Sequence, residues 1–322
     1  MANSTSVPLT SLSADSPRQW QLRPHLFQHR LHLDPRFARD GLSALIERYP
    51  REHYAIVHMG EQGAGGRRVW REGDIGALSG QQVLDAIEHG RLWLNLRNAP
   101  EVVPQLRELV TGIFTEAHAL APPVSSYDHL MGILVSSPGA QVYYHADLPG
   151  QGLLQLQGRK RIYIYPPRAP FLTEEGLENI ALKQLEVGLR YDPAFDAEAE
   201  VFELEPGQGL FWPLNAPHRI ENHDCLNVSM TLEYWTQDIR RKHIVNLANG
   251  ILRHNFGHAP RSRAITGGAF HAKTALQALW RRSGRLDVLR KHARPIDFRL
   301  DPDTPGGIID LGSALANEGH AA

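Results

Sequence analysis

The sequence predicts a mainly β protein, with a jelly-roll core between an α/β segment and a helical segment. Three observations support this prediction. Extended segments recur at short spacing from residue 125 to residue 236. Turn-forming residues (Gly, Pro, Asn and Asp) separate these segments, and the sequence on either side of them has helical periodicity. Seven or eight short strands over about 110 residues are typical of a sandwich or jelly roll. We expect a mobile tail at 1–18 and an α/β segment at 19–124 that packs on the core. The jelly-roll core is expected at 125–236 and a helical region at 237–322.

In the N-terminal segment, the residues at 53–61 predict a strand, and the Gly-rich residues 61–68 predict an exposed loop. Ser79 is expected to cap a helix, because apolar residues follow it at helical spacing. Residues 99–123 predict one amphipathic helix that Pro122 and Pro123 stop.

The core contains seven stretches that favour extended structure, with tight turns at Gln157-Gly158 and at 205–209. Helical patterns return at 236–256 and 271–292. The stretches are DHLMGILVSS, AQVYYHAD, QGLLQLQG, KRIYIYPP, EVFELEPGQGLFWP, HRIENH and LNVSMTLEYW.

Composition limits the classes of function. The 322 residues carry a net charge of −1, which argues against broad binding to nucleic acid or to anionic membranes. A single cysteine excludes intrachain disulfides and cysteine-cluster metal sites. We find no secretory signal and no run long enough to span a bilayer, so a cytoplasmic protein is expected.

His145 and Asp147 stand at i and i+2, a spacing that places both side chains on one face of a strand. With 17 histidines in the chain, roughly one His-x-Asp arises by chance, and a second occurs at His32 and Asp34. The alternative for His145 and Asp147 is a solvated strand end. His32 and Asp34 lack a strand-rich frame, which favours a loop or a strand edge.

His218 begins a late strand of the core, after a Pro-rich loop. Early and late strands of a jelly roll lie side by side, so His218 can join His145 and Asp147 on one face. Two histidines and one carboxylate with open positions suit non-haem Fe(II). A strand-end histidine with no metal role is the alternative.

Lys160 follows His145 by fifteen residues, on the strand after the Gln-Gly turn. A buried ammonium there would require an anion, which a dicarboxylate co-substrate supplies. Charge pattern alone favours the other interpretation, an exposed lysine between Arg159 and Arg161.

The segments HADLPGQGLLQLQGRKRIYIYPP and EPGQGLFWPLNAPHRIEN, with NVSMTLEYW after them, resemble the JmjC/cupin group of Fe(II)- and 2-oxoglutarate-dependent oxygenases. The similarity is greatest to the branch containing the asparaginyl hydroxylase that acts on the hypoxia-inducible factor. It covers about a third of the chain, residues 125–236, and implies a double-stranded β-helix core.

The resemblance also implies roles for individual residues. His145, Asp147 and His218 would bind iron, and Lys160 would pair with the distal carboxylate of 2-oxoglutarate. Tyr127 would hydrogen-bond the same carboxylate. Toward the other end of the co-substrate, Gln151 and Glu233 take the places of carboxamides that some relatives use, and Val142 replaces a hydroxyl residue.

The favoured function is therefore hydroxylation of an unactivated C–H bond with O2, Fe(II) and 2-oxoglutarate. A metal-dependent cupin isomerase or dioxygenase without 2-oxoglutarate, and a non-catalytic cupin sensor, are the alternatives. The sequence does not identify the substrate, which is a protein, peptide, amino acid or small metabolite. The C-terminal helices resemble the dimerisation helices of related hydroxylases, so we expect a homodimer.

Overall fold

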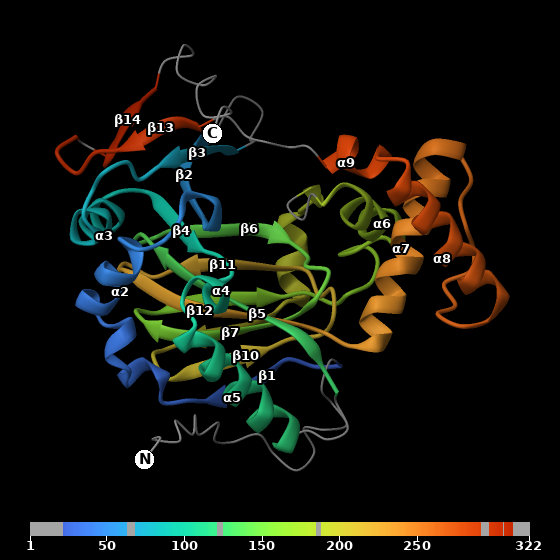
Figure 1. The fold of residues 1–322 in the computed structure, drawn as a ribbon, viewed down its shortest axis with the longest axis horizontal. Coiled ribbons are helices and arrows are strands. Elements are labelled where there is room, and N and C mark those ends of the chain that lie inside the picture. Colours follow the sequence, from blue (N-terminus) through green and yellow to red (C-terminus); the bar gives the residue numbers. More distant parts are fainter. Residues whose placement is uncertain are drawn as a thin grey trace.

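Two β-sheets face each other at the centre of the protein, with helices gathered around them (Figure 1). The computed structural model describes residues 22–62, 68–120, 125–184, 188–290, 296–304 and 306–311. The predicted mobile tail at 1–18, part of the Gly-rich loop and the Pro122-Pro123 helix stop lie outside these ranges.

Eight consecutive strands form the core, and the chain passes repeatedly from one sheet to the other. One sheet contributes β5, β7, β10 and β12, and the other is β6-β11-β8-β9, with every pairing among these eight antiparallel. This arrangement confirms the predicted double-stranded β-helix. The strands are β5 (Tyr127–Ser136), β6 (Gln141–His145), β7 (Gly150–Gln157), β8 (Lys160–Ile164), β9 (Glu200–Leu204), β10 (Gln208–Phe211), β11 (His218–Asn222) and β12 (Asn227–Trp235).

The space between the two sheets is filled by apolar side chains from both. Because side chains alternate along a strand, Ile162 and Ile164 of β8 point inward with Leu153 of β7, while Arg161 and Tyr163 point outward. The interior cluster is Leu153, Ile162, Ile164, Leu204, Leu210, Trp212, Ala216 and Ile220.

The N-terminal segment extends the larger sheet and covers its outer face. Strand β1 (His25–Gln28) pairs with β10, while β2 (Tyr54–Gln62), β3 (Arg68–Asp74) and β4 (Leu92–Leu96) continue the sheet beyond β5. The helices of this segment pack against the outer face through the largest apolar cluster. They are α2 (Arg39–Ile46), α3 (Gly80–His89), α4 (Ala99–Val102) and α5 (Gln105–Leu120), with short 3-10 turns at Leu31–Leu33, Pro35–Phe37 and Arg51–His53.

Two N-terminal helix predictions have different outcomes. Ser79 caps α3 in a capping box with Gln82, as expected. The single helix predicted over 99–123 is wrong, because the chain breaks between α4 and α5 at Pro104. Proline has no N–H to continue the helical hydrogen-bond ladder.

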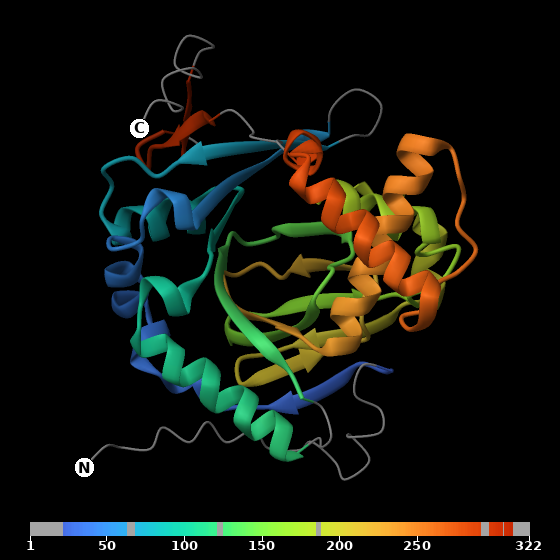
Figure 2. The same ribbon diagram turned by 45° about the vertical axis from the view of Figure 1, so that its right-hand side comes forward.

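The helices of the C-terminal half gather at one end of the double sheet, on the right of Figure 1 and nearer the viewer in Figure 2. Helix α6 (Glu174–Lys183) and a 3-10 helix, η5 (Pro193–Glu198), lie between β8 and β9 and were not predicted. Helices α7 (Gln237–Phe256), α8 (Gly267–Arg282) and α9 (Arg285–Arg290) occupy the predicted helical region.

The last described part of the chain departs from the predicted helical region. Residues Ile296–Leu300 form β13, parallel to β3, and Ile308–Asp310 form β14 beside it. The apolar–polar alternation of IDFRL is a strand signal that the prediction overlooked. Among the described residues, no helix is both long and apolar enough to cross a membrane.

Candidate metal and co-substrate site

Three predicted ligands converge at one end of the smaller sheet. His145 is the last residue of β6, His218 is the first of β11, and the two stand opposite each other in register. The Nε2 atom of His218 lies 3.4 Å from Asp147 Oδ2, and that of His145 lies 4.0 Å from Asp147 Oδ1. All three ligand atoms lie within 4.8 Å of one another. In the part of the chain that the structure describes, no other group of three potential ligands lies this close together.

Hydrogen bonds to backbone carbonyls fix the orientation and the tautomer of both imidazoles. Nδ1 of His145 lies 2.7 Å from the Tyr143 carbonyl, and Nδ1 of His218 lies 3.0 Å from the Ala216 carbonyl. A carbonyl only accepts, so Nδ1 must carry the proton and donate in both residues. Each Nε2 lone pair is therefore directed to the centre of the site, the arrangement found at metal-bound histidines.

The loop that carries Asp147 is held from two sides. Ala146 and Leu148 pack into an apolar cluster formed with α6 and α7. The Asn215 side-chain amide donates to the carbonyl oxygen of Asp147 at 2.5 Å. Packing and this hydrogen bond together set the position of the carboxylate before any ligand binds.

The charges of the site suit a divalent cation. Burial raises the pKa of Asp147, and burial together with the neighbouring His145 holds the pKa of His218 well below its usual value. His218 is therefore neutral near pH 7, and an ionised Asp147 places a buried negative charge beside it. Two imidazoles and a carboxylate with open positions form the donor set of non-haem Fe(II) sites.

Lys160 is buried inside the double-stranded β-helix, and its side chain is only 3 % exposed. It shares the inward face of β8 with Ile162 and Ile164, whereas Arg161 points outward and pairs with Glu203. The exposed-lysine interpretation is therefore wrong. No described residue forms a hydrogen bond or ion pair with its ammonium group, and burial lowers the pKa of Lys160 to about 7.

The structure does not bring Tyr127 to Lys160. Lys160 stands opposite Asn222 on β11, and Asn222 donates to Ser136 at the far end of β5 from Tyr127. Tyr127 and Ser136 are nine positions apart on β5, a distance of about 30 Å along the strand. A carboxylate bound to Lys160 is therefore out of reach of Tyr127.

Gln151 and Glu233 meet on the larger sheet, at the metal-ligand end. They are register partners on β7 and β12, and the Glu233 carboxylate accepts a hydrogen bond from the Gln151 side chain. Burial, with the negative charge of Asp147 nearby, raises the pKa of Glu233 to about 7. Glu233 is thus a second carboxylate near the three ligands, and at neutral pH it is partly protonated.

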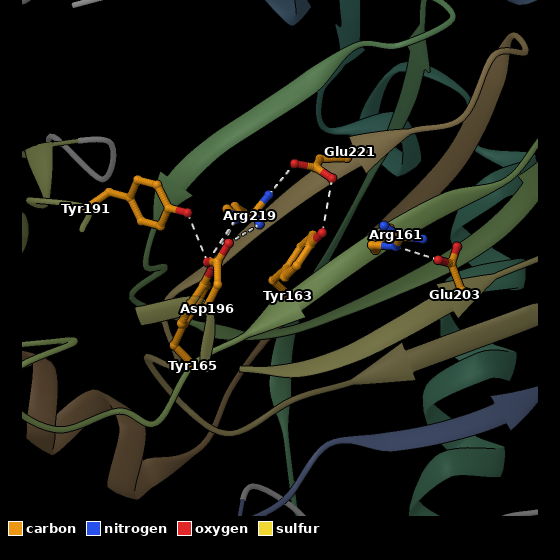
Figure 3. A network of polar contacts seen from close by, with 8 residues as sticks. All are labelled: Arg161, Tyr163, Tyr165, Tyr191, Asp196, Glu203, Arg219 and Glu221. Atoms are coloured by element: carbon orange, nitrogen blue, oxygen red, sulfur yellow. Dashed lines mark hydrogen bonds and ion pairs between the residues drawn. The ribbon is translucent and has the colours of Figure 1, made fainter. Parts of the chain in front are cut away.

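A polar network on the outer face of the smaller sheet was not predicted (Figure 3). Arg219 follows His218 and points away from the interior, where it donates to Asp196 of η5 at 2.6 Å and pairs with Glu221. The network ties η5 to β11 directly beside the His218 ligand. It comprises Tyr163, Tyr165, Tyr191, Asp196, Arg219 and Glu221, with the Arg161–Glu203 pair nearby.

The second His-x-Asp motif has a structural role. His32 belongs to a 3-10 turn, and Asp34 caps the next turn by accepting from the backbone N–H of Arg36 at 2.9 Å. Its carboxylate also pairs with the Arg36 guanidinium. The motif thus lies in two short turns, where the sequence favoured a loop or a strand edge.

Comparisons with known proteins identify the fold. No protein-family model and no curated protein matches the sequence. The structure of Escherichia coli ycfD superposes with a TM-score of 0.52 at 18% identity, over 90% of this chain and 71% of that chain. The chain has the double-stranded β-helix fold of the JmjC type.

Two further structures show weaker likeness. One is described as the Escherichia coli ribosomal oxygenase YcfD, with a TM-score of 0.48 and 17% identity over 89% of this chain and 69% of that one. The other is YcfD in complex with cobalt and 2-oxoglutarate, with a TM-score of 0.44 and 19% identity over the same shares. At such identities the likeness concerns the fold, and chemistry must be argued from the site residues.

Proposed function

We propose that this protein is an Fe(II)- and 2-oxoglutarate-dependent oxygenase that hydroxylates an unactivated C–H bond. The observation that carries the proposal is the pairing of two features within one barrel. His145, Asp147 and His218 offer an anionic donor set for iron, and Lys160 offers a buried ammonium group with no hydrogen-bond or ion-pair partner among the described residues. A buried unpaired cation is costly, so its presence calls for an anionic ligand.

The spacing along the sheet suits a five-carbon dicarboxylate. Lys160 and Ile164 are four residues apart on β8, and Ile164 stands opposite His218, so about 13 Å of strand separates the lysine backbone from the ligand histidine. A lysine side chain extends roughly 6 Å and an extended 2-oxoglutarate roughly 6 Å, from ordinary bond lengths. Together they bridge this distance.

Each residue then has a distinct task. Iron and 2-oxoglutarate supply the oxidising chemistry when bound. His145, Asp147 and His218 hold the metal and leave positions open, while Lys160 fixes the distal carboxylate through a charge-assisted hydrogen bond. Gln151 and Glu233 are proposed to contact the co-substrate near the metal, and the apolar barrel wall excludes water.

The test is turnover of 2-oxoglutarate, followed as succinate formation under air. We expect turnover to require Fe(II) and to disappear in Asp147→Ala. Metal-independent turnover would refute the mechanism. Loss of 2-oxoglutarate binding in Lys160→Ala with metal binding retained separates this function from a metal-dependent cupin isomerase or dioxygenase. Absence of iron uptake by the wild-type protein would instead support a non-catalytic cupin sensor.

Other expectations belong to the same proposal. A protein, peptide, amino acid or small metabolite is the substrate, with O2 as co-substrate, and no nucleic acid is expected. The YcfD relative is described as a ribosomal oxygenase, and the sequence itself resembles the asparaginyl hydroxylase branch. Cytoplasmic location and the boundaries of the four segments are proposed on sequence grounds.

We also propose a homodimer that forms through the C-terminal helices. Leu279 on α8 and Phe256 at the end of α7 are 68% and 61% exposed, so large apolar side chains on these helices are available for a contact with a second copy. Light scattering tests this proposal. A mass near twice 36.1 kDa supports it, and a monomer mass refutes it.

A further inference from the structure

A cavity of about 530 Å³ lies between helices α6 and α7 and residues 263–266, with Asn215 from the loop before β11 in its wall. Asn215 lines it and also donates to the Asp147 carbonyl, so the cavity wall is one hydrogen bond away from a ligand residue. Leu177, Val245 and Ile265 make part of the lining apolar. This volume is typical of a site for a small molecule or a few residues of a peptide.

The cavity carries an excess of positive charge. Arg263, in its wall, is paired with Glu178 at 2.5 Å and with Glu174 at 2.7 Å, and Glu178 also pairs with Arg253 at 2.7 Å. These two carboxylates balance the two arginines. Lys242, also in the wall, has no ion-pair partner among the described residues, and it is therefore the unbalanced charge.

Unused hydrogen-bond donors also face this region. Asn246 is only 7% exposed, and its Oδ1 accepts from Arg263 at 2.8 Å, whereas its Nδ2 has no acceptor within the described ranges. Thr266, another lining residue, begins helix α8 without a side-chain cap, and that first turn has no acidic residue. A cation, a buried amide donor and an uncapped helix start all favour an anion.

We propose that the cavity binds a carboxylate at the end of a short apolar stem, such as the side chain of glutamate. Lys242 and the Asn246 amide would hold the carboxylate, while Leu177 and Val245 contact the stem. The inference that this ligand is part of the oxidised substrate rests on the proposed function. Binding of the carboxylate itself does not, because it requires neither iron nor 2-oxoglutarate.

The experiment compares two capped amino acids by calorimetry without added metal. N-acetyl-L-glutamate N-methylamide carries the carboxylate, and N-acetyl-L-glutamine N-methylamide is its neutral isostere. We expect wild-type protein to bind the glutamyl probe roughly fivefold more tightly, the scale of one partly exposed ion pair. Lys242→Met keeps the side-chain length and should abolish this preference, whereas the control Lys183→Met, on α6, should retain it.

Equal affinity for the two probes, or a preference that survives Lys242→Met, overturns the proposal. Free L-glutamate and the tripeptide N-acetyl-Gly-Glu-Gly-amide then distinguish two sources of the same chemistry. Tighter binding of the tripeptide supports a polypeptide ligand, and tighter binding of free glutamate supports a metabolite. Neither result depends on turnover, so failure of the oxygenase proposal and failure of this one are separable.

Discussion

Replacing Lys160 by methionine should make the protein more stable and remove its ability to bind 2-oxoglutarate. The ammonium group is buried and has no hydrogen-bond or ion-pair partner among the described residues, and burial lowers its pKa from 10.5 to about 7. At pH 7 a depression of this size costs about 4 kcal/mol of folding free energy. Methionine has a similar length and no charge, so Lys160→Met should recover this amount.

The sign of the pH dependence gives an independent check. Between pH 7 and 10.5 the unfolded chain holds the Lys160 proton and the folded chain does not, so wild-type stability rises with pH in this window. Below pH 7 the penalty is present in full. The slope contributed by Lys160 should be missing from Lys160→Met.

Thermal unfolding and calorimetry measure the two effects. For 322 residues the unfolding entropy is about 0.7 kcal/mol/K, so 4 kcal/mol raises Tm by about 6 °C. In the presence of Mn(II), affinity for 2-oxoglutarate should fall at least about 100-fold, because a buried carboxylate loses its counter-charge. Lys183→Met is the control and should change neither quantity. A variant with unchanged Tm and unchanged affinity would refute the reasoning.

Three further predictions concern the metal, the pH dependence and the outer network. Asp147→Ala should abolish Mn(II) binding measured by calorimetry. Asp34→Ala should still bind Mn(II) and should lose about 1 kcal/mol of stability, because Asp34 caps a 3-10 turn. Loss of Mn(II) binding in both variants would contradict the assignment of Asp147 as a metal ligand. Above pH 7, the binding of one 2-oxoglutarate molecule should be coupled to the uptake of one proton, because Lys160 becomes charged in the complex. Calorimetry in two buffers of different ionisation enthalpy measures this uptake. A value of zero would contradict the proposed role of Lys160. Arg219→Met should lower the free energy of unfolding by about 2 kcal/mol, measured by urea denaturation, because Asp196 and Glu221 lose their counter-charge. An unchanged urea midpoint of unfolding would contradict this prediction.

The core strands and the convergence of the three candidate ligands could be predicted because their signals are local. Alternating side chains and Gly or Pro turns mark each strand, and the i, i+2 spacing puts His145 and Asp147 on one face. Pairing with His218 required one further assumption, that early and late strands of a jelly roll are neighbours, and the register confirms it.

The remaining features depend on tertiary structure. Arg159 and Arg161 make Lys160 look exposed, and only the hairpin geometry decides that its side chain turns inward while Arg161 turns outward. The resemblance implied that Tyr127 and Lys160 contact the same carboxylate, but the length of β5 separates the two residues. The Arg219–Asp196 pair joins residues 23 positions apart, and Asp196 lies between β8 and β9 in a segment with no extended or metal-binding pattern.

The most direct test of the central claim is calorimetric titration of 2-oxoglutarate into protein loaded with Mn(II). We predict one binding site in the wild-type protein, loss of 2-oxoglutarate binding in Lys160→Met with Mn(II) still bound, and loss of both in Asp147→Ala. Binding of 2-oxoglutarate that is equally tight in all three proteins, or absent from the wild type, would contradict the account.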